Sequence, residues 1–147
     1  MSNITFDTAR AQVSLFSNQS KGLRHHHEAM ECRDCEDFLQ IGIDAFSWIE
    51  RAHENLRRRI YEGTATFDPE VEDALTTLYE SWLLSCTDAE KWISIQQSRG
   101  YYPDNLTEFR HCQEEVRDIL EQRTLARKSR LARLSPTTTE DGTVDES

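Results

Sequence analysis

The sequence predicts an all-α protein: an elongated antiparallel up-down bundle of three long helices plus an N-terminal helix. Apolar residues recur every three or four positions along most of the 147 residues, which is the period of helices with one buried face. Only five glycines and three prolines occur. That is too few for a β-sandwich or barrel, which needs a turn every ~8–12 residues. Short connections between the apolar stretches predict antiparallel neighbours.

The N-terminal helix is expected to begin near residue 6. Its apolar positions alternate steps of three and four, which places them on one face: Phe6, Ala9, Val13, Phe16, Ser20 and Leu23. Gly22 is a candidate interruption near the end of this helix.

The second helix is predicted to be the central element. One face carries Phe38, Gly42, Phe46, Ile49, His53, Leu56 and Ile60. Ile41, Ile43 and Trp48 lie off this face, so the helix is apolar almost all round, which is typical of a helix surrounded by others. Three arginines and then Gly63 suit its C-terminal end. Its start stays open, because residues 24–37 contain no helix breaker.

The third helix has the clearest start, with Asp68 as the capping residue and Pro69 at the first helical position. One face carries Val71, Leu75, Leu78, Trp82, Ala89, Trp92 and Ile93, and Gly100 follows the predicted end. Residues 87–90 read Thr-Asp-Ala-Glu, the pattern of a capping box, so a break near residue 86 is an alternative.

The fourth helix is expected to begin after a cap at Asn105. Its apolar positions are Leu106, Phe109, Cys112, Val116, Ile119 and Leu120, with an extension of the same face to Leu131 and Leu134. In up-down order the second and fourth helices run parallel. Residues 1–134 are therefore predicted to form one domain, and residues 135–147 a disordered acidic tail, since their composition cannot form a core.

The net charge of −10 is unevenly distributed. Residues 123–134 hold five basic and no acidic side chains, and residues 1–122 hold 12 basic and 23 acidic ones. Such acidity argues against a nucleic-acid-binding domain. The arginines ending the second helix would lie at the same end of the bundle as the basic residues of the fourth.

Location is predicted from what the sequence lacks. No apolar stretch approaches the ~18 residues of a membrane span, so no membrane contact is expected. The first residues lack the basic and apolar regions of a signal peptide. We therefore expect a cytoplasmic protein whose four cysteines are reduced thiols.

One segment carries residues suited to metal binding. On a helix, His25, Glu28, Cys32 and Cys35 would share one stripe, and imidazole, carboxylate and thiolate are ligands for Zn²⁺. Cysteines of neighbouring helices, at positions 86 and 112, could complete the site. Strong zinc-binding sequence patterns contain two separated pairs of ligand residues, however, and only one Cys-x-x-Cys pair is present here. The alternative is that these cysteines pack as small apolar residues.

A di-metal carboxylate site is not expected, although two Glu-x-x-His motifs occur, ending at His53 and His111. His111 should face solvent when Val116 faces the core. Glu72 and Glu80 are predicted to point away from the face of Leu78. His53 is therefore interpreted as a partly buried, hydrogen-bonded histidine.

Catalytic signatures are missing: the glycines are isolated, and no Gly-x-Ser-x-Gly motif occurs. We therefore expect a non-catalytic helical interaction or regulatory protein that acts through protein–protein contacts, with a protein partner or by self-association. Trp48, Tyr101 and Tyr102 are candidate partner-binding aromatics. The alternative function is a metal-binding helical bundle that uses residues 25–35. No cofactor other than that Zn²⁺ is expected.

Overall fold

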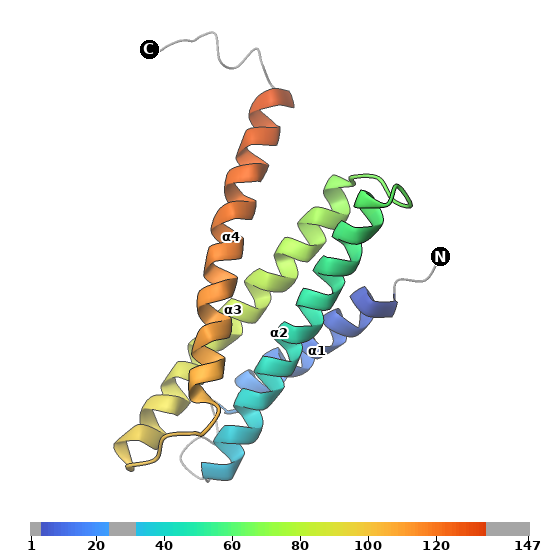
Figure 1. Cartoon of the computed structure of the whole chain (residues 1–147). Helices are drawn as coiled ribbons and strands as arrows, with labels where there is room; N and C mark the ends of the chain where they lie inside the picture. The colour runs from blue at the N-terminus through green and yellow to red at the C-terminus, as the bar shows by residue number, and fades with distance from the viewer. Residues whose placement is uncertain (1–3, 24–31, 135–147) are drawn as a thin grey trace, which may run out of the picture.

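A computed structural model describes residues 4–23 and 32–134 of the chain, and all four of its elements are helices (Figure 1). They are α1 (Ile4–Leu23), α2 (Cys32–Tyr61), α3 (Pro69–Ser98) and α4 (Leu106–Leu134). In Figure 1, α2 and α3 form an antiparallel hairpin, and α4 runs in the same direction as α2. The predicted all-α bundle with an N-terminal helix is confirmed. None of the described helices combines the length and the apolar character that a membrane crossing requires.

The start of α3 follows the sequence signals. Pro69 is its first residue, and the Asp68 carboxylate accepts a hydrogen bond from the Glu70 backbone N–H at 3.0 Å. This bond satisfies one of the donors left open at a helix start. After α2 and α3 end, Gly63 (φ 79°) and Gly100 (φ 84°) adopt left-handed conformations that favour glycine.

The alternative of a break near residue 86 is wrong, because α3 continues without interruption to Ser98. The capping-box residues lie inside the helix, where Asp88 and Ala89 are buried. Trp82 and Trp92, on either side of the expected break, pack into the same core. A continuous helix holds both rings on the buried face, and this packing outweighs the local capping preference. Likewise α1 passes Gly22 without interruption and ends at Leu23.

The core is centred on aromatic rings from all four helices. The ring of Phe16 lies 5.3 Å from that of Phe38, 5.7 Å from that of Trp82 and 6.3 Å from that of Phe109, between centroids. As predicted, α2 contacts each of the other three helices. Burying large rings from every helix in one cluster is the main source of stability in such a bundle.

Gly42 lies at the centre of this cluster. A Cβ atom at this position would be 2.8 Å from Cε1 of Phe16 on α1 and 3.0 Å from Cε1 of Phe109 on α4. The indole N–H of Trp82 on α3 donates to the Gly42 carbonyl oxygen at 2.7 Å. The missing side chain therefore lets three helices approach α2 at one point.

The core contribution of α4 ends early. Its buried residues are Phe109, Cys112, Gln113 and Val116, and Ile119 and Leu120 are partly buried. Beyond them α4 diverges from the α2–α3 hairpin (Figure 1). The predicted extension of the core to Leu131 and Leu134 is wrong, because both are exposed. We call residues 120–134 the outer half of α4.

Candidate functional site

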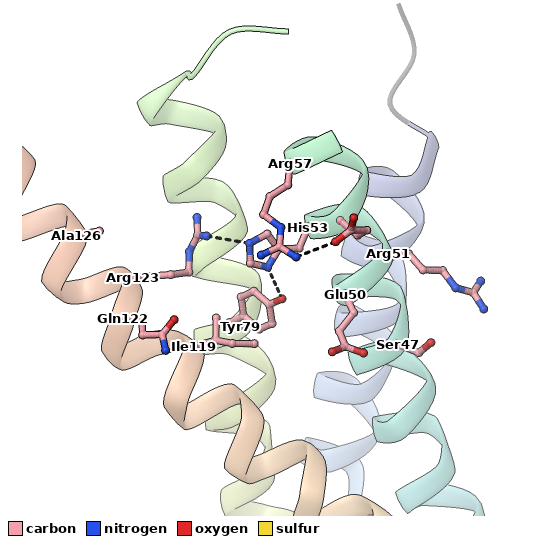
Figure 2. Close-up of a pocket in the computed structure, with 11 residues that line it drawn as sticks. Ser47, Glu50, Arg51, His53, Arg57, Tyr79, Ile119, Gln122, Arg123 and Ala126 are labelled. Carbon is pink, nitrogen blue, oxygen red and sulfur yellow. Dashed lines mark hydrogen bonds and ion pairs between the residues drawn. The ribbon is translucent and has the colours of Figure 1, made fainter. Parts of the chain in front are cut away.

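A polar cleft of about 780 Å³ opens between α2, α3 and α4, where α4 begins to diverge (Figure 2). We call it the α2–α4 cleft. Figure 2 shows His53 and Arg57 on α2 directed toward Tyr79 on α3 and Arg123 on α4, whereas Arg51 points away. The residues that line the α2–α4 cleft are Ser47, Glu50, Arg51, His53, Glu54, Arg57, Tyr79, Ile119, Gln122, Arg123 and Ala126.

His53 connects the three helices through both of its ring nitrogens. Its Nδ1 lies 2.9 Å from the Tyr79 hydroxyl oxygen, and its Nε2 lies 3.4 Å from NH1 of Arg123. Arginine can only donate, so Nε2 is the acceptor and Nδ1 carries the hydrogen that is donated to Tyr79. The prediction of a partly buried, hydrogen-bonded histidine is confirmed.

Arg123 is held by more partners than any other cation of the cleft. Its guanidinium donates to the Glu72 carboxylate at 2.6 Å, to the Glu72 carbonyl oxygen at 2.8 Å and to the Thr76 hydroxyl at 2.8 Å. The side chains of Arg123 and Glu72 are only 13% and 16% exposed. With the bond to His53, four of its five N–H hydrogens are engaged. Arg123 therefore acts mainly as a connection between α4, α3 and α2.

Glu72 lies off the face of Leu78, as expected, but it meets α4 there instead of solvent. The side of α3 toward α4 includes Tyr79. Glu72 lies seven residues before Tyr79 and so on the same face of the helix. Arg123 on α4 meets it there. Glu80 is exposed, as predicted.

Three ionisable groups of the cleft, His53, Tyr79 and Glu50, have pKa values shifted toward their neutral forms. Burial, reinforced by the positive charge of Arg123, lowers the pKa of His53 to about 4. Burial and the nearby Glu50 carboxylate raise the pKa of Tyr79. The pKa of Glu50 is itself raised, by partial burial and by repulsion from Glu115. At neutral pH the histidine and the tyrosine are therefore neutral hydrogen-bonding groups.

Protonation of His53 is expected to destabilise the fold as the pH falls. The unfolded chain binds this proton below pH ~6.5 and the folded chain only below about pH 4, so stability decreases between these values. After allowance for partial exposure, the loss attributable to His53 is about 1–2 kcal/mol. Urea unfolding at pH 7 and pH 4.5 measures it. The His53→Gln variant should show a smaller loss, and an equal loss in both proteins would contradict the assignment.

Further out, acidic residues of α3 pair with the arginines of α4. Arg127 and Arg130 lie 3.6 Å and 3.9 Å from the Asp73 carboxylate, and Arg130 lies over the ring of Phe67, 5.1 Å from its centroid. On α2, Arg57 pairs with Glu54 at 2.8 Å. The basic residues that end α2 and α4 therefore lie at the same end of the bundle, as predicted, since both helices end on the same side (Figure 1). Much of the charge of these residues is compensated.

The predicted metal site cannot be assembled from the described residues. His25 and Glu28 lie outside them, and α2 begins at Cys32, whose side chain is also outside the description. Cys35 is buried in the core. Within residues 4–23 and 32–134, no group of three His, Cys, Asp or Glu residues could hold a metal ion. The Zn²⁺ site at residues 25–35 stays a prediction.

Cys86 and Cys112 pack as small apolar residues. Both are buried, and burial raises the pKa of each thiol to about 12. Neither supplies a thiolate at neutral pH, because the charged form is disfavoured inside the core. His111, from the rejected di-metal pattern, is exposed as expected.

The three candidate partner-binding aromatics lie in different surroundings. Trp48 is half-buried against the core, and the guanidinium of Arg51 lies over its ring, 4.6 Å from the centroid. Tyr101 is half-buried and hydrogen-bonded to Glu36, which also accepts the Asp104 backbone N–H at 2.9 Å. Tyr102 is exposed. A role in partner binding stays a prediction for all three.

Sequence reasoning missed the connection from Glu72 through Arg123 to His53. Its only local signal is the seven-residue spacing between Glu72 and Tyr79, which places an acidic residue on a packed face. Nothing in the sequence names Arg123 as the partner.

Comparisons with models of protein families, with curated proteins and with solved structures find no match for this chain. Function is therefore inferred from the geometry of the chain alone.

Proposed function

We propose that this chain is a non-catalytic helical interaction protein, and that it contacts another polypeptide through the outer half of α4. One observation carries the proposal. The last fully buried residue of α4 is Val116, yet the helix continues to Leu134, about five further turns. Along this part Leu125, Leu131 and Leu134 are 61%, 57% and 78% exposed.

The position of these leucines supports a contact surface. Single exposed leucines are common, but all three of these line apolar recesses, Leu125 on one side of α4 and Leu131 and Leu134 on another, and such recesses are typical of interaction sites. A recess of about 330 Å³ lies where α4 passes the start of α3, and its apolar lining is Phe67, Pro69, Leu131 and Leu134.

The fixed position of the outer half of α4 also supports the proposed contact surface. Beyond Leu120, pairs of Arg123 with Glu72 and of Arg127 with Asp73 hold the outer half of α4 beside α3. A surface that is already ordered loses little conformational freedom when a partner binds. The neutral His53 and Tyr79 of the α2–α4 cleft fit this view, since they hydrogen-bond to each other and so connect α2 with α3.

Site-specific photocrosslinking tests the proposal. A benzophenone amino acid is placed at Leu125 or at Leu131, and the matched control carries it at Leu15, an exposed leucine of α1. After irradiation in native cells, we expect crosslinked protein from the first two positions and none above background from the control. Equal yields from all three positions, or no product from α4, would refute the proposed surface.

A further inference from the structure

A shallow apolar groove lies between α3 and the outer half of α4. Leu83 of α3 and Leu120 and Leu125 of α4 supply its apolar surface, and its volume is about 420 Å³. It is on a different flank of α4 from the α2–α4 cleft, since the two share no lining residue. We call it the α3–α4 groove. The rest of its lining consists of Arg117, Glu121, Thr124 and Lys128.

The charged residues that line this groove are Arg117, Glu121 and Lys128, and none of them forms an ion pair within residues 4–23 and 32–134. Nearby Arg123 and Arg127, by contrast, pair with α3. Glu121 and Lys128 are seven residues apart, so they lie on the same side of α4, two turns from each other. Leu125 lies between them along the helix.

The charge of α4 is divided along its length. Residues 106–121 carry five acidic and two basic side chains, and residues 122–134 carry five basic and no acidic ones. A parallel copy of this helix would place like charges side by side. An antiparallel copy would place each basic half beside an acidic half, which is the favourable arrangement for opposed charges.

We propose that the partner of α4 is a second copy of this chain, bound as an antiparallel α4 pair across the α3–α4 groove. The two-fold axis passes near Thr124 and Leu125. Leu125 of each copy lies against the groove of the other, and Glu121 faces Lys128 of the partner subunit in two equivalent ion pairs. This inference rests on the proposed function, since it names the polypeptide bound by the outer half of α4.

Antiparallel pairing brings residues with different numbers together, whereas parallel pairing brings each residue beside the same residue of the other copy. A two-fold axis makes position 121 of one copy meet position 128 of the other, and the reverse. Overlap of residues 115–134 of each copy would extend over about 30 Å of helix. The two-fold axis places the two ion pairs symmetrically on either side of Leu125. Reversing the charge at position 121 or 128 therefore affects both ion pairs of the dimer equally.

Charge exchange at these two positions tests the pairing by sedimentation equilibrium. E121K carries only cations at the two positions, and K128E carries only carboxylates. Each variant alone is expected to dimerise at least about tenfold more weakly than the unmodified chain, because both ion pairs become repulsive. An equimolar mixture of the two, and the double variant E121K/K128E, should both recover dimerisation.

The matched control is E62K, which makes the same change at an exposed residue of the α2–α3 connection. It should leave dimerisation unchanged, and circular dichroism verifies that every variant is folded. A chain that stays monomeric at all concentrations would overturn the inference. So would a dimer insensitive to the charge changes, or two variants whose mixture does not recover dimerisation.

The two proposals fail in different ways. If Leu125 crosslinks to a different protein and the purified chain is monomeric, the proposed function stands and the second copy is wrong. If no crosslink forms at Leu125 or at Leu131 and no dimer forms in solution, both are wrong.

Discussion

Replacing Gly42 by alanine is expected to lower the free energy of unfolding by about 2 kcal/mol. The added methyl group would lie within 3 Å of the Phe16 ring, which cannot easily move, because it packs on Phe38, Trp82 and Phe109. Overpacking of this kind typically costs 1–3 kcal/mol. Alanine has a better helix propensity than glycine by about 1 kcal/mol, which offsets only part of an overpacking cost near 3 kcal/mol.

Urea unfolding followed by circular dichroism measures the effect, with Gly22→Ala as the matched control. A Cβ atom at Gly22 meets nothing within 4 Å, so this second glycine tests helix propensity without crowding. The control should be as stable as the original chain or slightly more stable. Combining Gly42→Ala with Phe16→Leu should show a coupling between the two sites, since the smaller side chain relieves the contact. Equal stability of the two alanine variants would show that the helices are not in close contact at Gly42.

Replacing Arg123 by methionine is expected to cost about 3 kcal/mol of stability. The change leaves the Glu72 carboxylate without its cation in a site that is largely closed to water, and it removes hydrogen bonds to Thr76 and His53. Removing one member of a buried ion pair costs roughly 3–5 kcal/mol, and the lower end applies because both side chains keep some exposure.

A local measurement separates this role from a general loss of stability. Amide hydrogen exchange in the outer half of α4 should accelerate more than exchange around Phe109, because Arg123 is the first of the connections that hold that part of the helix. Arg133→Met is the control, since Arg133 is exposed and, among residues 4–23 and 32–134, donates only to Ser129 of its own helix. A double variant, Arg123→Met with Glu72→Gln, should regain part of the stability. If Arg123→Met behaves like the control, the outer half of α4 is held in another way.

The polar connection and the proposed pairing use different faces of the same helix. Arg123 and Arg127 hold α4 beside α3, while Glu121 and Lys128 stay available to a second copy. Arg123→Met should therefore weaken dimerisation only through the loss of order in α4. E121K should weaken it without any change in hydrogen exchange of the isolated chain.

The sequence by itself determined the helices. The three-and-four spacing of Phe6, Ala9, Val13 and Phe16 identified the buried face of α1, and all four residues are buried. The cap at Asp68 located the start of α3. These features are readable because helix period and capping depend on residues within one or two turns of each other.

Only the tertiary structure decided where the core ends and which charges meet. The face of α4 continues to Leu134 in the sequence, but the helix diverges after Leu120, so its last leucines are exposed. The pairing of Arg123 with Glu72 joins residues far apart in the chain and depends on how two helices lie against each other. Periodicity indicates which side of a helix is buried, whereas the partner across the interface is set by the packing of whole helices.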